Sequence, residues 1–235
     1  MKVKVIAFDI FGTVVDWWSG IANQVNRTSR EKRVSIEGGK FAEEWRARYI
    51  PSMDLVRKGE LEWMNLDGLH RRSLDQLLVE FNANSLDEET RGTMVHFWHH
   101  LPPWKDVQEG LTRLSKKYTL AALSNGGFAL LTSLAKEGNL DFDCIISAEL
   151  FKHYKPDKEV YQGAASLLEA KPEETLMVAS HIWDLDGARN AGLETCFVER
   201  PLEKGPKGRA DRLSDATRFN LGVHDFLELA KILGC

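Results

Sequence analysis

The sequence predicts an α/β protein with a doubly wound, Rossmann-like parallel sheet that is interrupted early by an inserted helical subdomain. Two observations lead to this fold class. Beyond residue 103, apolar runs of strand length alternate with segments of helical periodicity, which is the order that produces parallel βαβ units. Before that point, a single short apolar run is followed by a long stretch with helical spacing, roughly residues 17–98.

The first strand is expected at residues 3–8, and it ends at an aspartate. Residues 5–8 are all apolar, as in a strand that is buried on both faces. Asp9 follows directly, and Gly12 then permits a sharp turn. A carboxylate is therefore expected at the carboxyl end of a central parallel strand, where open α/β sheets bind their ligands.

The helical segment sets the predicted domain boundaries. Helical spacing runs through 41–52 and 61–81, and Ser85–Glu88 has the pattern of a helix N-cap. Pro102 and Pro103 end the segment, because proline cannot continue a helix. We expect a helical cap over residues 16–100 and a catalytic core made of residues 1–15 and 101–235.

The rest of the core is expected to alternate strands with helices. The predicted strands cover residues 118–124, 143–147, 175–180 and 195–198, and the predicted helices cover 107–114, 128–135, 160–168 and a segment ending at 190. Gly192 is expected to terminate the last of these helices. Residues 201–212 are rich in glycine, proline and charge, which predicts a surface loop.

Composition narrows the range of functions. The 235 residues carry a formal net charge of −4, which argues against a general binder of nucleic acid or membrane surfaces. No apolar run approaches the roughly 20 residues of a membrane span, and the N-terminus does not resemble a signal peptide. The three widely spaced cysteines predict free thiols and a cytoplasmic protein. A homodimer is compatible with the sequence, which does not determine the oligomeric state.

Polar residues follow three further predicted strands. Ser124 and Asn125 precede two glycines at a helix start, which favours an anion such as a carboxylate or phosphate. Lys155 follows the next strand and is suited to neutralise a carboxylate and orient a nucleophile. The segment 180–184, which ends in Trp183 and Asp184, follows the fourth strand.

These four strand ends resemble the four motifs of the haloacid dehalogenase superfamily, in order and over nearly the whole chain. In that superfamily the first aspartate is a covalent nucleophile. The phosphatase branch has a second acidic residue where this chain has Phe11, and another where it has Ser180. In the phosphatases the first of these acidic residues is the acid–base group and the second helps to hold Mg²⁺. Phosphoryl transfer needs cations to neutralise oxygen charge, so the loss of these residues counts against a phosphatase. The motifs are more similar to those of L-2-haloacid dehalogenases, which use neither a metal nor another cofactor.

The resemblance implies a role for each matching residue. Asp9 would attack the halogen-bearing carbon, Thr13 and Lys155 would hold its carboxylate, and Asp184 would position or activate water. Arg46 would support the departing halide, with Arg48 as the alternative arginine. The implied substrate-binding residues are Phe11, Ser124, Asn125, Tyr161, Ser180, His181 and Trp183.

One position departs from the family pattern, because His181 stands where the family usually has asparagine. The larger ring, together with tryptophans of the cap such as Trp45 and Trp63, predicts a tight halide pocket with N–H donors and therefore activity on fluoroacetate. A structural role for His181 is the alternative. Likewise, Trp183 is either a pocket wall or a core residue.

The resemblance therefore predicts hydrolytic dehalogenation of small 2-haloalkanoic acids through an aspartyl ester, giving a 2-hydroxy acid and halide. Two alternatives remain open. A phosphatase of the same fold would require Mg²⁺. A non-catalytic binding protein would be expected to lack one of Asp9, Lys155 or Asp184, and all three are present. The histidines at 96, 99 and 100 lack a further ligand at convincing spacing, so no metal site is expected there.

Overall fold

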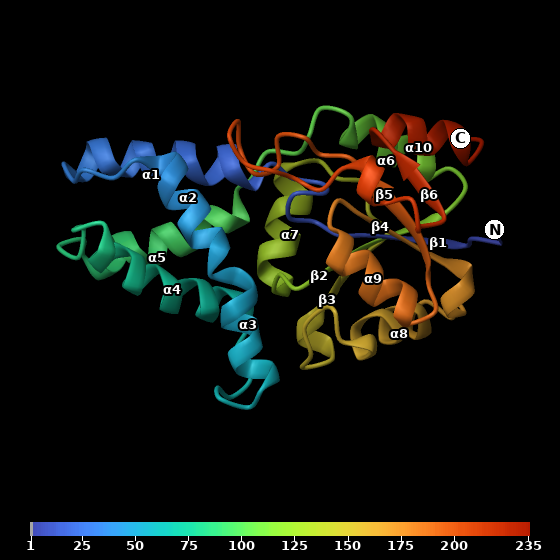
Figure 1. Cartoon of the computed structure of the whole chain (residues 1–235), viewed down its shortest axis with the longest axis horizontal. Helices are drawn as coiled ribbons and strands as arrows, with labels where there is room; N and C mark the ends of the chain where they lie inside the picture. Colours follow the sequence, from blue (N-terminus) through green and yellow to red (C-terminus); the bar gives the residue numbers. More distant parts are fainter. Residues whose placement is uncertain (1) are drawn as a thin grey trace. The chain divides into compact units, whose positions relative to one another are not determined.

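The computed structural model describes residues 2–235 and divides the chain into two compact units (Figure 1). Unit 1 contains residues 1–16 and 102–235, and unit 2 contains residues 17–101. The sequence places the same two junctions one residue earlier, at 15/16 and 100/101. No helix in the part of the chain that the structure describes is long and apolar enough to cross a membrane.

Unit 1 is built on a six-stranded parallel sheet, which confirms the predicted fold class. The strand order is β3-β2-β1-β4-β5-β6, with β1 in the interior of the sheet. The strands are β1 (Val5–Phe8), β2 (Thr119–Ser124), β3 (Cys144–Ser147), β4 (Thr175–Ala179), β5 (Glu194–Val198) and β6 (Leu221–Val223). Every residue of β1 is buried, as expected for a strand with both faces covered.

Helices cover both faces of this sheet. Figure 1 shows α6 and α10 on one face and α8 and α9 on the other. The helices of unit 1 are α6 (Val107–Leu114), α7 (Phe128–Glu137), α8 (Lys158–Leu167), α9 (Ile182–Asn190) and α10 (Phe226–Ile232). Gly192 follows α9 with a φ of 93°, in the left-handed region, so its predicted place at the end of this helix is confirmed.

Unit 2 is entirely helical in the structure. It contains α1 (Trp17–Lys32), α2 (Gly38–Ala47), α3 (Tyr49–Arg57), α4 (Leu66–Glu80), α5 (Glu88–Val95) and the 3₁₀ helix η1 (His96–His99). Within the predicted N-cap sequence of α5, the capping residue is Asp87, whose side chain accepts from the Thr90 N–H at 2.8 Å.

The core of unit 2 is aromatic. Trp17, Trp45 and Trp98 are all buried, and the Trp45 and Trp98 rings meet edge to face at 5.5 Å. The Trp45 indole N–H donates to the carbonyl of His70 at 3.2 Å and to the hydroxyl of Ser73 at 3.1 Å. The prediction that Trp45 offers its N–H to a halide is therefore wrong, because this donor is used inside the unit.

The register of the sheet brings the predicted motif residues together. Phe8, the last residue of β1, pairs with Ala122 of β2 on one side and with Val178 of β4 on the other. The segments that follow β1, β2 and β4 therefore begin at the same edge of the sheet. Asp9 lies in the middle of this edge.

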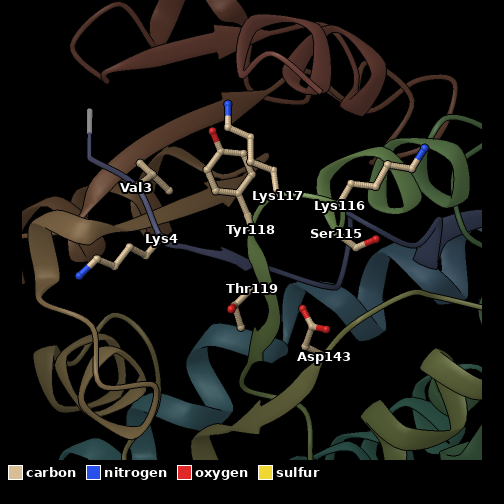
Figure 2. A pocket seen from close by; sticks show the side chains of 8 residues that line it. All are labelled: Val3, Lys4, Ser115, Lys116, Lys117, Tyr118, Thr119 and Asp143. Atoms are coloured by element: carbon tan, nitrogen blue, oxygen red, sulfur yellow. The ribbon is translucent and has the colours of Figure 1, made fainter.

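A pocket lies at the opposite edge of the sheet, where β1 and β2 begin (Figure 2). It is lined by Val3, Lys4, residues 115–119 and Asp143. The Asp143 carboxylate accepts from the Leu120 N–H at 2.7 Å, and the Lys117 ammonium donates to the Leu233 carbonyl at 2.7 Å. These polar groups hold the edge of the fold together, and the chemistry is to be sought at the carboxyl ends of the strands.

Two expectations for unit 1 need correction. The edge strand β6 was not expected, because it has only three residues and Gly222 stands at its centre. The segment 201–212 is not simply a surface loop, since Glu203 and Ala210 are buried within it. All three cysteines are free thiols, as predicted; Cys196 is fully buried and Cys144 is half-buried.

Candidate active site

Asp9 is a nearly buried carboxylate with bonding partners on both oxygens. Its N–H donates to the Val178 carbonyl at 2.9 Å, so the backbone is still held by the sheet. The side chain is 10% exposed. Oδ1 lies 3.3 Å from the Lys155 ammonium, and Oδ2 accepts from Thr13 at 2.8 Å and lies 3.2 Å from His181.

The pKa of Asp9 reflects these neighbours. Burial alone would raise it, but the charges of Lys155 and His181 and the hydrogen bonds from His181 and Thr13 hold the pKa of Asp9 well below its usual range. The carboxylate is thus ionised and has few contacts with water, a state suited to nucleophilic attack.

Thr13 orients one oxygen of Asp9 through a directed chain of hydrogen bonds. Its hydroxyl proton goes to Asp9 Oδ2, so the hydroxyl must accept from its other neighbours. These are the Ser180 N–H at 2.9 Å and the Ser180 hydroxyl at 3.1 Å. Ser180 therefore donates to Thr13 in this structure, and these hydrogen bonds fix the direction of the Thr13 hydroxyl proton.

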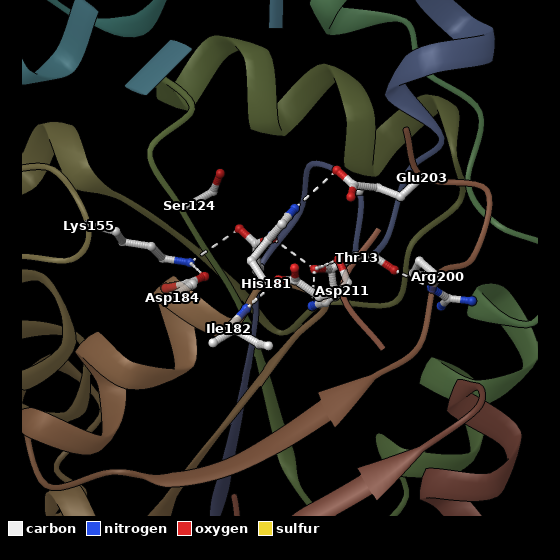
Figure 3. Close-up of polar contacts among 12 residues, drawn as sticks. Thr13, Ser124, Lys155, His181, Ile182, Asp184, Arg200, Glu203 and Asp211 are labelled. Carbon is white, nitrogen blue, oxygen red and sulfur yellow. Dashed lines mark hydrogen bonds and ion pairs between the residues drawn. The ribbon is translucent and has the colours of Figure 1, made fainter. Parts of the chain in front are cut away.

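Lys155 connects two carboxylates. Its side chain is 1% exposed, and its ammonium lies 2.8 Å from Asp184 Oδ2 as well as 3.3 Å from Asp9 Oδ1 (Figure 3). Asn125 holds the lysine backbone, because its Oδ1 accepts from the Lys155 N–H at 2.7 Å. Asn125 thus joins the segment after β2 to the segment that carries the lysine.

Asp184 is fully buried in the first turn of α9. It accepts from the Tyr161 hydroxyl at 2.6 Å and from Lys155 at 2.8 Å. Burial and the nearby charge of Asp9 raise the pKa of Asp184, against the opposing effect of Lys155. The pKa of Tyr161 is also raised well above its usual value, by burial and by Asp184, so the phenol stays protonated and donates. A carboxylate with a raised pKa is a better acceptor for a proton from water.

His181 contacts the Asp9 carboxylate on one side and another buried carboxylate on the other. Its Nδ1 lies 3.2 Å from Asp9 Oδ2, and its Nε2 lies 3.1 Å from Oε1 of Glu203 (Figure 3). Burial lowers the pKa of His181, but Glu203 and Asp9 outweigh it and raise the pKa to about 10. The ring is therefore an imidazolium, and both of its N–H groups are directed at protein carboxylates.

Three predicted substrate-binding residues lie around this cluster in different settings. Ser124 is fully buried, and its hydroxyl accepts from the Gly126 N–H at 3.2 Å. Phe11 is buried and forms an isolated bridge with Val15. Trp183 is half-buried, with its ring 6.0 Å from that of His181. Trp183 is therefore not a fully buried core residue.

Arg46 belongs to unit 2, where aromatic rings surround its guanidinium. The guanidinium carbon lies 4.1 Å from the centre of the Tyr49 ring and 5.5 Å from that of Trp17. Its buried Nη1 has no hydrogen-bond partner among the described residues. Arg48, by contrast, forms ion pairs with Glu44 at 3.1 Å and Glu80 at 2.7 Å. Of the two arginines, Arg46 has a donor available for an anion.

Sequence reasoning missed the residues that reach this site from the segment after β5. Glu203 contacts His181, and Asp211 accepts from the Ile182 N–H at the start of α9 at 2.9 Å. Arg200 donates to the Thr13 carbonyl at 2.9 Å. The only signal was a cluster of charges in a segment whose glycines and prolines predicted exposure.

The histidines of η1 do not form a metal centre with their neighbours. His99 Nε2 lies 3.0 Å from Asp67 Oδ2, and the His96 and His99 rings are 4.7 Å apart. Across residues 2–235, no group of three or more histidine, cysteine or acidic side chains is arranged to hold a metal ion.

This chain is similar to known proteins over most of its length. One similar protein, (S)-2-haloacid dehalogenase 1 of Pseudomonas sp. (strain CBS-3), is 32% identical over 210 residues, which cover 84% of this chain and 85% of that protein. The crystal structure of an L-2-haloacid dehalogenase superposes with a TM-score of 0.94 at 42% identity and covers 99% of both chains. That of a defluorinating L-2-haloacid dehalogenase gives a TM-score of 0.95 at 37% identity, over 99% of this chain and 96% of that one.

The family relationship also covers the residues that build the site. The model of the haloacid dehalogenase-like hydrolase family matches residues 3–192, a range that contains Asp9, Lys155, His181 and Asp184 but ends before Glu203. With the parallel sheet, the residues at its carboxyl edge and a family match over most of the sequence in agreement, this chain belongs to the haloacid dehalogenase-like hydrolases.

Proposed function

We propose that this protein hydrolyses the carbon–halogen bond of small 2-haloalkanoic acids, giving the 2-hydroxy acid and halide through an ester on Asp9. The observation that carries the proposal is the buried, ionised Asp9 carboxylate, with Lys155 on one oxygen and Thr13 and His181 on the other. The similarity to named 2-haloacid dehalogenases supports the choice of substrate class.

In the first step, a lone pair of Asp9 Oδ1 forms a bond to the halogen-bearing carbon while the halide leaves with its electron pair. Oδ1 is the better nucleophile, because Lys155 approaches it at 3.3 Å, whereas Oδ2 is held by Thr13 at 2.8 Å and by His181 at 3.2 Å. Attack is favoured because the carboxylate is held in place and shielded from water. Arg46 is the proposed partner of the departing halide.

In the second step, water adds to the Asp9 ester carbon and Asp184 takes its proton. Asp184 is suited to this role because its pKa is raised and its position is fixed by Lys155 and Tyr161. Collapse of the tetrahedral intermediate releases the 2-hydroxy acid and regenerates Asp9. We expect this sequence to require no metal or other cofactor, since Lys155 and His181 supply the positive charge around the nucleophile.

Fluoroacetate is included in the proposed substrate range. A similar protein with a TM-score of 0.95 is named as a defluorinating enzyme. The sequence-based reason for this expectation, that His181 donates to the halide, needs revision, because both ring nitrogens face carboxylates. The proposed activity on fluoroacetate therefore does not depend on a hydrogen bond from His181 to the halide.

Halide release tests the proposal directly. Purified protein is incubated with fluoroacetate, chloroacetate, bromoacetate and both enantiomers of 2-chloropropionate, with and without prior chelation. We expect chloride and bromide release that survives chelation, and measurable fluoride release. Phosphomonoesters with added Mg²⁺ form the comparison arm. Phosphate release there without any halide release would overturn the proposal.

Isotope transfer tests the ester. In a single turnover in water enriched with ¹⁸O, the label should enter the Asp9 carboxylate, because product takes its new oxygen from the enzyme. Mass spectrometry of the peptide containing Asp9 locates the label. Label found in the product of the first turnover would show that water attacks the substrate directly.

A further inference from the structure

Glu203 is a buried acid that contacts His181, a residue of the proposed reaction centre. Its side chain is 2% exposed, and Oε1 lies 3.1 Å from His181 Nε2. It belongs to the segment after β5, outside the residues matched by the family model. A carboxylate is costly to bury, so its place beside an imidazolium calls for a physical reason.

The turn that carries Glu203 is anchored to the segment after β1. Arg200 forms a bidentate ion pair with Asp106, with Nη1–Oδ1 and Nη2–Oδ2 distances of 2.7 and 2.9 Å. Its Nε donates to the Thr13 carbonyl at 2.9 Å. The Glu203 N–H then donates to the Arg200 carbonyl at 3.0 Å, which closes the turn. The acid is therefore held by the same residues that shape the loop of the nucleophile.

Gly12 makes room for this acid. Its φ is +86°, a conformation that favours glycine, and a Cβ atom there would lie 2.6 Å from Glu203 Oε1. The turn after Asp9 thus meets the Glu203 side chain at a position where no larger residue fits. The turn after Asp9 and the segment that carries Glu203 therefore pack closely beside His181.

The imidazolium is directed at one oxygen of Asp9. Nδ1 lies 3.2 Å from Oδ2, the oxygen that also accepts from Thr13 at 2.8 Å. If Oδ1 forms the ester, as the proposed function requires, Oδ2 becomes the ester carbonyl oxygen. Negative charge then develops on Oδ2 when water adds, and stabilisation there accelerates hydrolysis.

We propose that Glu203 is a positioning residue for hydrolysis of the Asp9 ester: it holds His181 so that the imidazolium N–H, with the Thr13 hydroxyl, stabilises the oxyanion that forms on Oδ2. This inference rests on the proposed function. It also assigns His181 to the second chemical step and not to the departing halide.

Hydrolysis of the Asp9 ester consumes one water molecule. The oxygen of water bonds to Asp9 Cγ, one of its protons passes to Asp184, and the carbonyl electron pair moves onto Oδ2. When the carbonyl re-forms, the bond between Cγ and Oδ1 breaks, and the departing alkoxide takes the proton from Asp184. The second water proton is on the restored Asp9 carboxyl and is lost to solvent. His181 and Glu203 donate no proton and are unchanged at the end.

The test is Glu203→Gln, which keeps the size of the side chain and removes its charge. With chloroacetate in excess, we expect a burst of one chloride per active site, followed by a steady-state rate about tenfold or more below wild type. Acid quenching and intact-protein mass spectrometry should show the carboxymethyl ester accumulating on Asp9. The alkaline loss of activity should begin at a lower pH in the variant, because His181 loses a charged partner.

A change of substrate separates the two chemical steps. Fluoroacetate and chloroacetate form the same carboxymethyl ester on Asp9, so the rate of its hydrolysis in Glu203→Gln should be the same from either substrate. Glu199→Gln, in the same segment but paired with His224 at 3.3 Å, is the matched control and should behave as wild type. In a His181→Asn background, Glu203→Gln should have no further effect on ester hydrolysis.

The proposal is overturned if Glu203→Gln slows the burst itself and no ester accumulates. It is also overturned if the substitution still slows ester hydrolysis in the His181→Asn background, a comparison that holds even where Glu203→Gln lowers stability. These outcomes differ from failure of the proposed function, in which the wild-type protein itself releases no halide or places no label in Asp9.

Discussion

The buried polar groups around Asp9 in unit 1 differ from those around Arg46 in unit 2 in how completely they are hydrogen-bonded. In unit 1, Asp9, Lys155 and Asp184 each contact at least one oppositely charged or donating side chain, and His181 has a carboxylate at each nitrogen. In unit 2, the described residues leave Nη1 of Arg46 and both nitrogens of His70 without a hydrogen-bond partner. An unmade hydrogen bond in a buried site costs about 1–3 kcal/mol per group.

The difference indicates two kinds of site. The groups at the sheet edge are already oriented by one another, so chemistry there requires little reorganisation. The Arg46 guanidinium instead has a donor in reserve, which is expected of a group that binds an anion arriving with the substrate. Burial keeps the neighbouring His70 uncharged, since its pKa is lowered to about 3 by burial, with Arg46 and His99 contributing and Asp67 opposing.

The largest effect is expected at the nucleophile. Asp9→Asn should reduce halide release by roughly a thousandfold or more, because an amide cannot form the ester. The matched control is Asp186→Asn, which changes an exposed aspartate paired with Arg218 at 2.6 Å. Steady-state halide release is measured for both, together with thermal unfolding. Comparable losses in the two variants would show that the effect is not specific to the carboxylate at the end of β1.

His181 should make stability depend on pH. Its folded pKa of about 10 lies above the ordinary value of 6.5, so its contribution is fully present below pH 6.5 and is lost as pH rises towards 10. The loss should be on the order of a few kcal/mol. Urea unfolding of wild type and His181→Asn between pH 6 and 10 measures it as the difference between the two curves, since other groups titrate in both proteins. Parallel curves would contradict the charged state of the ring.

Substitutions of Arg46 and Arg48 test whether the unpaired Nη1 donor of Arg46 binds the departing halide. Arg46→Lys should lower kcat by about 10- to 100-fold with a smaller change in KM, because an ammonium cannot reproduce the planar fork towards a departing halide. Arg48→Lys is the control and should change kcat by less than about twofold, since surface ion pairs contribute little. A loss at Arg48 without one at Arg46 would transfer the role to the residue that the structure pairs with Glu44 and Glu80.

Much of the fold and of the nucleophile's surroundings could be predicted from local sequence. The buried run before Asp9 is a short-range signal, and a parallel sheet brings the strand ends together without further information. The places of Thr13, Lys155 and Asp184 follow from this local pattern. The place of Glu203 does not, because its burial depends on the hydrogen bond from Arg200 to the Thr13 carbonyl, a contact between residues far apart in the sequence.

The direction in which a side chain points is also not evident from the sequence. The sequence shows that Trp45 lies on a helix, but not that its N–H turns towards Ser73 inside unit 2. For His181, the replacement of asparagine was visible while its partner was not. With Glu203 absent from the argument, a donor to halide was the natural interpretation, and the direction of both N–H groups changes that assignment. The three-residue β6 was missed because so short an edge strand carries no periodicity.

The smallest effect is expected at His70, whose two unpaired ring nitrogens have no role in the proposed reaction. The ring stacks on Trp98 at 4.4 Å and meets Trp45 edge to face at 5.9 Å, contacts that a phenyl ring retains. His70→Phe removes two buried nitrogens that lack partners among the described residues, so the free energy of unfolding should rise by about 1 kcal/mol or more. Halide release should stay within about twofold of wild type. Urea denaturation measures the first quantity, and a loss of more than about 2 kcal/mol would show that these nitrogens are hydrogen-bonded in solution. A large fall in activity at unchanged stability would instead extend the reserve of donors from Arg46 to its neighbour.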